Sequence, residues 1–356
     1  MVHLIGDAVT STWIFVAILA ASLAFGARRR DPDEPLFPKR VTEELKGFAI
    51  LAVFFAHVGY FLVDDSRFLF PLSSAPGVGV DIFLLLAGYG LATSAIATPR
   101  SAFHFYRRHL PKLYAPMWAA LAAIFLTDYF SLGRDRSLGY VARSFLGYFP
   151  TADLFSDVNS PLWYFTFIVG CYLLFPLLFS AKRPWLSAAA YAGLGYALTA
   201  ASPSALSGVI DLYEKHYLAF PLGVALAWLL SPEKPATHRL LALRGNAAGT
   251  WIAGALLATA ACATVFLSGV GTEHEQLESL LLASLITLAF LLKPLRLPLL
   301  GAFGACSYEV YLLHWPIVSR YVPAYSFLPG WLATAASLSL VFGLARASRK
   351  LSAPRT

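Results

Sequence analysis

Apolar residues in this chain fall in blocks of about 16 to 22, the length that a helix needs to cross a hydrocarbon core of about 30 Å. Hydrophobic residues make up 58% of the 356 positions and charged residues only 13%, whereas soluble domains carry about 25% charge. The blocks predict an all-α, polytopic transmembrane bundle of about eleven spans. We expect the spans at residues 8–26, 45–63, 77–98, 113–131, 161–180, 185–202, 216–231, 248–269, 277–292, 299–319 and 327–345.

The apolar blocks follow one another without a long polar segment between them. We therefore expect one membrane domain over residues 41–356, preceded in residues 1–40 by a further transmembrane helix and a cytoplasmic linker. The basic cluster Arg28–Arg30 follows the first block and does not precede it. This order is the reverse of a secretory signal peptide, so the first helix is predicted to be retained.

Lys and Arg are unevenly divided between the two alternating sets of loops. One set holds 21 of the 27 basic residues, and cytoplasmic loops are the ones that carry such an excess. The pattern predicts an N-terminus outside and a C-terminus in the cytoplasm. The net charge of +7 then indicates contact with anionic membrane lipid and not with nucleic acid. The three cysteines have neither a disulfide framework nor metal-ligand spacing, so we expect no metal.

The second block, ELKGFAILAVFFAH, carries a lysine near one end and a histidine at the other. Lys46 and His57 are separated by about 20° more than three helical turns, so they share a face and lie about 16 Å apart along the axis. His57 is therefore placed near the middle of the bilayer, where ionisable residues usually face the bundle interior or a wet cavity. It is either a neutral buried histidine, with Lys46 snorkelling to the interface, or a general base at the end of a passage that opens at Lys46.

Two further segments carry charged groups. GVGVDIFLLLAGYG places Asp81 near the outer end of the third span, where it caps the helix or orients a histidine. HFYRRHLPKLYAP is expected to be a cytoplasmic loop with Arg107, Arg108 and Lys112. These three side chains either reflect the excess of cytoplasmic basic residues or form a site for phosphate.

Two later segments carry aromatic and ionisable groups. SPLWYFTFIVGCYLLFPLL opens with Trp163 and Tyr164, which are expected at the outer interface, where aromatic belts are ordinary. SYEVYLLHWP places His314 in the outer half of the tenth span. Glu309 lies five residues before His314 and about 140° around the helix, so the two do not share a face.

Four of these segments, taken in order, resemble the motifs of the membrane-bound acyltransferase-3 family. They are LKGFAILAVFFAH, GVDIFLLLAGYG, FYRRHLPKLYAP and SYEVYLLHWP, within about residues 41 to 345. The resemblance implies ten family-like helices after one additional N-terminal helix. It also implies transfer of an acyl group from a cytoplasmic acyl-CoA, most simply acetyl-CoA, to a hydroxyl of an extracytoplasmic glycan or lipid-linked acceptor.

The resemblance assigns expected roles to the polar residues. His57 is predicted to be the general base, and Asp81 and His314 are the other candidate catalytic residues, although His314 could equally be a packing residue. The donor's phosphates are predicted to bind a basic cluster, and the acceptor an aromatic and acidic set. These sets are Lys46, Arg107, Arg108 and Lys112 for the donor, and Trp163, Tyr164 and Glu309 for the acceptor.

The chain departs from the family pattern at several positions. Lys46 and Lys112 stand where the family has arginine, and lysine keeps the charge but loses the bidentate geometry. Ala87 replaces a serine, and the helix that opens with PLW differs from the WSLSxEEQFY-like helix of many members. The chain also lacks the appended extracytoplasmic hydrolase-like domain that some members carry.

Two other functions use the same residues. A proton-coupled transporter or flippase would use the intramembrane histidines and carboxylates for proton coupling, although paired inverted repeats of the kind common in transporters are not evident. A catalytically inactive sensor or scaffold with the family's fold would explain the replacement of arginine by lysine.

Overall fold

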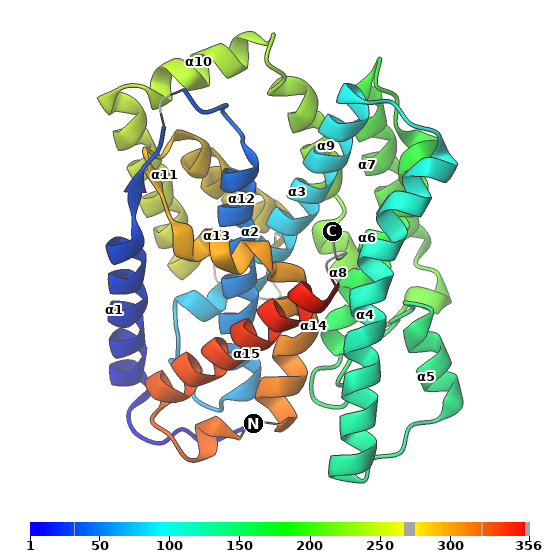
Figure 1. Cartoon of the computed structure of the whole chain (residues 1–356), viewed down its shortest axis with the longest axis vertical. Helices are drawn as coiled ribbons and strands as arrows, with labels where there is room; N and C mark the ends of the chain where they lie inside the picture. The colour runs from blue at the N-terminus through cyan, green and yellow to red at the C-terminus, as the bar shows by residue number, and fades with distance from the viewer. Residues whose placement is uncertain (32, 267–274, 322, 353–356) are drawn as a thin grey trace.

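The computed structural model describes residues 1–31, 33–266, 275–321 and 323–352. These ranges form a helical bundle with one short antiparallel strand pair, β1 (Arg28–Arg29) with β2 (Leu295–Arg296), so the all-α prediction is confirmed (Figure 1). The longer helices are α1 (Ala8–Gly26), α2 (Lys39–Ala56), α3 (Pro76–Ala97), α4 (Ala102–Leu132), α6 (Trp163–Leu178), α7 (Pro184–Ala201), α11 (Ala247–Phe266), α12 (Glu275–Leu292) and α15 (Gly330–Ser352). The shorter ones are α5 (Leu138–Phe145), α8 (Ile210–His216), α9 (Ala219–Leu229), α10 (Pro235–Arg244), α13 (Pro298–Ala305) and α14 (Ser307–Pro316).

Seven helices of the described ranges are long and apolar enough to cross a membrane. An eighth candidate is the pair α10 and α11, which is bent by 95° at its break. Three of the other expected spans are formed by α7, by α8 and α9 together, and by α13 and α14 together. Two of these three expected spans consist of two shorter helices each, which the length of an apolar block does not reveal, whereas α7 is a single helix.

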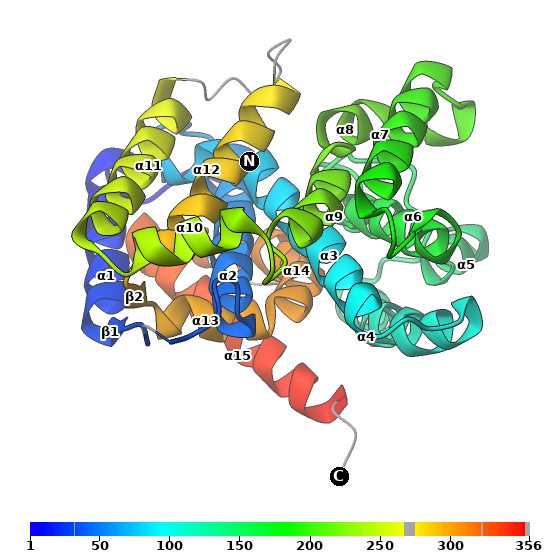
Figure 2. The ribbon, with the colours of Figure 1, turned by 90° about the horizontal axis from the view of Figure 1, so that it is seen from above.

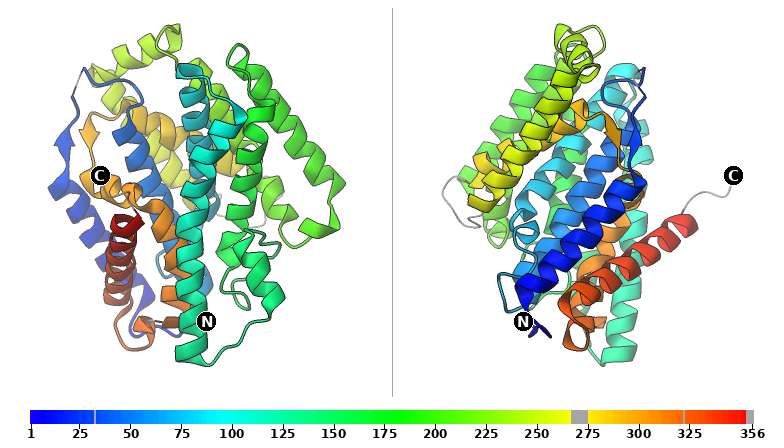
Figure 3. Two further views of the ribbon diagram at one scale, coloured as in Figure 1. Left: turned by 45° about the vertical axis from the view of Figure 1, so that its right-hand side comes forward. Right: turned by 90° about the vertical axis from the view of Figure 1, so that its left-hand side faces the viewer.

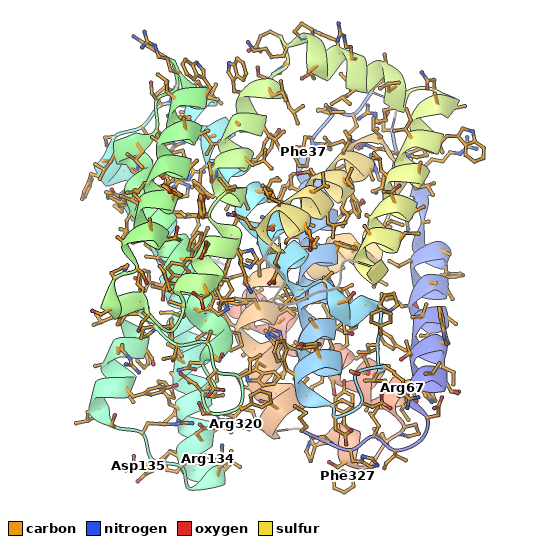
Figure 4. All side chains as sticks on the ribbon, turned by 180° about the vertical axis from the view of Figure 1, so that it is seen from behind. Phe37, Arg67, Arg134, Asp135, Arg320 and Phe327 are labelled. Carbon is orange, nitrogen blue, oxygen red and sulfur yellow. The ribbon has the colours of Figure 1, made fainter. Side chains whose placement is uncertain are left out.

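The two ends of the bundle differ in charge. We call the end that holds α10 and the first turns of α2 and α4 the basic end; it lies at the top of Figure 1. Figure 4 shows Phe37 near this end, whereas Arg67, Arg134, Arg320 and Phe327 lie at the opposite end. The segment before α2 and the start of α4, which were both predicted to be cytoplasmic, therefore lie at the same end of the molecule.

Helix α2 lies at the centre of the bundle, between α3, α12, α13 and α14 (Figure 2). Of the most apolar 18 residues in Lys39–Leu62, which is α2 with the turn that follows it, 72% are buried inside the protein. Glycines allow α13 to cross α2 in backbone contact, because a Cβ on Gly304 would lie 1.6 Å from the Glu43 carbonyl oxygen and one on Gly47 would lie 1.9 Å from that of Leu300. The crossing holds α2 in a fixed position, and α14 then begins immediately after α13.

The linker between α1 and α2 is anchored to the basic end by buried polar contacts. The Arg30 guanidinium, 7% exposed, donates to the Leu291 and Leu36 carbonyl oxygens at 3.0 and 2.8 Å. It also pairs with Glu34, which in turn accepts from Arg296 at 3.0 Å. These bonds tie the additional N-terminal helix to the rest of the bundle.

The segment HFYRRHLPKLYAP is helical, and the expectation of a loop there is wrong. Helix α4 begins after Ser101, whose hydroxyl accepts from the His104 backbone N–H at 3.3 Å. The helix continues through Pro111 and Pro116 and ends at Gly133, which has a φ of 59°. Within a bundle the neighbouring helices support a helix that contains proline.

The last helix, α15, does not run parallel to its neighbours. Figures 2 and 3 show that it crosses the bundle obliquely and that its final turns project from it. Within the bundle it packs against α14 and α1. Helix α14 is therefore held between α2 on one side and α15 on another.

Candidate active site

Two histidines from distant parts of the chain meet in the middle of the bundle. His314 Nε2 lies 3.0 Å from His57 Nδ1. His57 follows the last residue of α2, at the start of a π turn (His57–Leu62), and His314 lies near the end of α14, just before a second π turn (Ile317–Tyr321). π turns inside helices are rare and are frequent at functional sites. His314 was expected further towards the outer surface, but the contact places it at the same depth as His57.

The hydrogen-bond partners of the two rings determine where each proton lies. His314 Nδ1 faces the Tyr311 and Val310 carbonyl oxygens at 2.8 and 3.2 Å. Since a carbonyl oxygen only accepts, this nitrogen carries the hydrogen, and Nε2 of the neutral ring is then an acceptor. His57 Nδ1 faces that acceptor and the Val53 carbonyl oxygen at 2.9 Å, so it too carries a hydrogen. The lone pair of His57 therefore lies on Nε2.

A cavity of about 200 Å³ joins His57 to Lys46. Both side chains line it, as the shared helical face of α2 predicted. Lys46 forms no hydrogen bond or ion pair with any described residue. The other lining residues come from α2, α3, α4, α6, α14 and the turn before α6, and they are Val53, Val80, Phe83, Ala87, Leu113, Pro161, Trp163, Tyr164, Ile168, Tyr172, Ser307, Tyr308 and Tyr311.

The other predicted donor-binding cations lie outside this cavity. Arg107, Arg108 and Lys112 are exposed on the first turns of α4. Leu113, which follows Lys112, lines the cavity. Arg108 and Lys112 are one turn apart and share a face, whereas Arg107 lies about 100° from Arg108. The structure thus places one cation, Lys46, inside the cavity and three more on the surface of an adjoining helix.

Asp81 does not contact the histidine pair. It is fully buried on α3, and its carboxylate accepts from the His216 Nδ1–H at 2.8 Å and from the Ser279 hydroxyl at 2.5 Å. Asp81 is not a helix cap, because α3 begins at Pro76. His216, which was not among the expected site residues, ends α8 and is 4% exposed. The one signal for it in the sequence was an imidazole at the first residue of an apolar block.

Trp163 and Tyr164 line the cavity instead of lying only at an interface. The Trp163 ring stacks against His216, with centroids 5.8 Å apart and an angle of 19° between the planes. Tyr164 packs edge-on against Trp163 at 6.2 Å and against Tyr311 at 5.6 Å. An aromatic wall thus separates the cavity from the buried Asp81–His216 pair.

Glu309 lies on a different face of α14 from His314. It lines a second cavity, of about 440 Å³, between α4, α14 and α15. The helical angle between the two residues predicted this separation. The structure therefore does not bring Glu309 together with Trp163 and Tyr164.

A cluster at the opposite end of the bundle was missed by the sequence analysis. Asp128 on α4 is fully buried, and its carboxylate accepts from Arg320 at 3.0 Å, from Arg136 at 3.1 Å and from the Tyr321 hydroxyl at 2.8 Å. Arg320 and Tyr321 belong to the π turn that follows His314 (Figure 4). An aspartate inside an apolar block was the available signal. The cluster fastens the end of the helix that carries His314 to α4.

A comparison with known protein families gives one match. A family model described as an acyltransferase domain, acyltransferase-3, matches residues 44–346, which is most of the chain. Neither a curated protein nor a solved structure gives a significant match. The match includes both histidines, Lys46 and the Asp81–His216 pair. The chain therefore belongs to the acyltransferase-3 family and is an integral membrane acyltransferase.

Proposed function

We propose that this protein moves an acyl group from acyl-CoA, with acetyl-CoA as the simplest donor, to a hydroxyl of an extracytoplasmic glycan or lipid-linked acceptor. The observation that carries the proposal is the single cavity that Lys46 and His57 both line. It offers a cation for the donor at one end and an unprotonated imidazole nitrogen at the other. The basic end is cytoplasmic in this proposal, with the N-terminus outside and the C-terminus inside, in a bacterial cytoplasmic membrane.

The donor's charge and shape suit the basic end. Coenzyme A carries several phosphate charges, and Arg107, Arg108 and Lys112 are exposed on α4 beside the cavity. Its pantetheine arm is long and thin, so it can extend past Lys46 towards His57. The ammonium of Lys46 lies on this path and offers up to three hydrogen-bond donors to the arm or to a phosphate.

The chemical step follows from the position of the lone pair on His57. Nε2 takes the proton of the acceptor hydroxyl as its oxygen attacks the thioester carbonyl carbon. The C–S bond of the resulting tetrahedral species then breaks, and the proton passes from His57 to the leaving thiolate, so the free thiol and the ester are the products. General-base assistance of this kind contributes about 10²- to 10⁴-fold.

The second histidine supports the first during this step. When Nε2 of His57 takes a proton, the ring becomes a cation whose Nδ1–H already donates to the Val53 carbonyl and to His314 Nε2. A hydrogen bond that involves a charged donor is roughly twice as strong as a neutral one. His314 is therefore a positioning residue that stabilises the cationic form of His57.

The experiment uses the purified full-length protein in vesicles, with radiolabelled acetyl-CoA as donor and a bacterial cell-envelope extract as acceptor. We expect thiol release and transfer of label to the extract, and we expect His57→Ala to lower both by at least about 10²-fold. His238→Ala is the matched control, because His238 is exposed on α10. A wild-type protein that releases no thiol while it moves substrate across the vesicle would instead identify a transporter. An inactive wild-type protein that does neither would identify a scaffold.

A further inference from the structure

Behind the wall of the cavity, three polar side chains from three helices form a unit that the mechanism above does not use. Asp81 on α3, His216 on α8 and Ser279 on α12 are all less than 9% exposed and are joined by two hydrogen bonds of 2.8 and 2.5 Å. Gly77, one turn before Asp81, makes room for them, since a Cβ there would lie 3.1 Å from the Ser279 hydroxyl oxygen and 3.3 Å from the His216 ring. The two hydrogen bonds offset the cost of burying these groups and hold the three side chains in fixed positions.

The group that the unit holds is the Trp163 indole. Of the three side chains, only the His216 ring stacks on Trp163, and Trp163 is in turn a lining residue of the cavity that contains His57. The indole is thus supported by the ring of His216, and by that of Tyr213 at 6.2 Å, while it also lines the cavity. Asp81 fixes the His216 ring through Nδ1, so the ring cannot rotate without breaking a buried hydrogen bond.

The position of Trp163 identifies the end of the cavity that it closes. Trp163 is the first residue of α6, and Val80, another lining residue, is in the second turn of α3. Both helices run towards the basic end, so their first turns lie on the side away from it, whereas Lys46 lies in the first half of α2, which begins at the basic end (Figure 1). The donor enters from the Lys46 side, so the acceptor has to approach from the side of Trp163.

We propose that His216, held by Asp81 and Ser279, is a positioning residue that fixes Trp163 as the acceptor-side wall of the cavity. This inference rests on the proposed function, because it assigns that wall to the acceptor. Trp163 excludes water from the thioester until an acceptor displaces or packs against the indole. A closed site of this kind suppresses hydrolysis of a reactive donor.

The first experiment measures access to the cavity and needs no acceptor. In a protein whose three native cysteines are replaced by alanine, Val80→Cys is labelled with a charged, membrane-impermeant methanethiosulfonate added to the face opposite the basic end. His216→Ala and Trp163→Ala should each raise the labelling rate by about threefold to tenfold, the factor that one net hydrogen bond or contact represents. The double variant should label no faster than Trp163→Ala alone, because His216 acts through Trp163.

Matched variants separate positioning from folding. His216→Asn keeps an N–H donor for Asp81 but lacks the ring, so it should label as fast as His216→Ala. His216→Phe keeps the ring but loses the bond to Asp81, and its rate should lie between those of wild type and His216→Ala. An unchanged rate in His216→Asn, or rates that add in the double variant, would overturn the proposal. His238→Ala should match wild type.

The second experiment connects the wall to the reaction. Thiol release from acetyl-CoA is measured without acceptor in the wild type, His216→Asn and Trp163→Ala, each with and without His57→Ala. Release of thiol by hydrolysis should rise about threefold to tenfold in His216→Asn and in Trp163→Ala. It should disappear when either is combined with His57→Ala. Increased labelling without increased release would limit His216 to a packing role and overturn the assignment. If no variant releases thiol, the proposed function fails, and the labelling rates still decide whether His216 positions Trp163.

Discussion

The Nε2 atom of His314 accepts from the Nδ1–H of His57 at 3.0 Å, and this one contact assigns a different task to each histidine. It leaves His57 with a free lone pair on the nitrogen that lies away from both Val53 and His314. It leaves His314 with none, since its Nδ1–H donates to backbone carbonyl oxygens. The two imidazoles are therefore not interchangeable, although both are intramembrane histidines at the end of a helix.

The role of His314 predicts different effects for two replacements. His314→Gln offers an amide oxygen that can accept from His57, whereas His314→Leu has a similar volume and no acceptor. We expect the kcat of His314→Leu to be about threefold to tenfold lower than that of His314→Gln, because that factor corresponds to one net hydrogen bond. The KM for the donor should change little. Thiol release by the purified protein measures this, and equal losses in the two variants would contradict the assignment.

Substitutions of Lys46 should change the KM for the donor and leave the rate of the chemical step largely unchanged. Replacing it with methionine keeps most of the volume and removes the charge, so KM for acetyl-CoA should rise about tenfold or more, as expected for the loss of a hydrogen bond to a charged group. Lys46→Arg restores the family's arginine and should lower KM. The same replacements at Lys112, which is exposed on the surface beside the cavity, should change KM less than those at Lys46. A KM that does not respond to either change at Lys46 would remove it from the donor site.

Lys293 and Glu44 form a buried ion pair at the basic end, so replacing Lys293 should destabilise the protein more when Glu44 is still charged. The Lys293 ammonium donates to the Glu44 carboxylate and to the Leu295 carbonyl oxygen, and Glu44 also accepts from the Leu297 backbone N–H at 2.9 Å. Lys293→Met leaves a buried carboxylate without its cation, which costs about 3–5 kcal/mol. Adding Glu44→Gln should recover much of that loss. Thermal unfolding in detergent checks both variants, and no recovery in the double variant would contradict the pairing.

The crossing of α2 and α13 predicts that one glycine is required and another is not. A Cβ on Gly304 would lie 1.6 Å from the Glu43 carbonyl oxygen, whereas a Cβ on Gly343 in α15 meets nothing within 4 Å. Gly304→Ala should therefore separate the two helices and destabilise the protein strongly. Gly343→Ala should leave it unchanged or stabilise it by about 0.5–1 kcal/mol, because alanine is the better helix former. Similar midpoints for both variants in thermal unfolding would show that the close crossing is not required.

Relationships within one helix could be predicted from the sequence. The lysine and histidine of the second block share a face of α2 because helical periodicity is a property of the backbone, and the structure finds both in one cavity. The separation of Glu309 from His314 on α14 follows in the same way. The motif order also identified the family, which the comparison confirms.

The sequence by itself thus determined that this chain is an apolar helical bundle, which face of α2 holds Lys46 and His57, and which family it belongs to. Only the tertiary structure decided that His57 pairs with His314 and that Asp81 pairs with His216. The physical reason is distance along the chain. These partners are 257 and 135 residues apart, and the packing of whole helices brings them together, which no local pattern encodes.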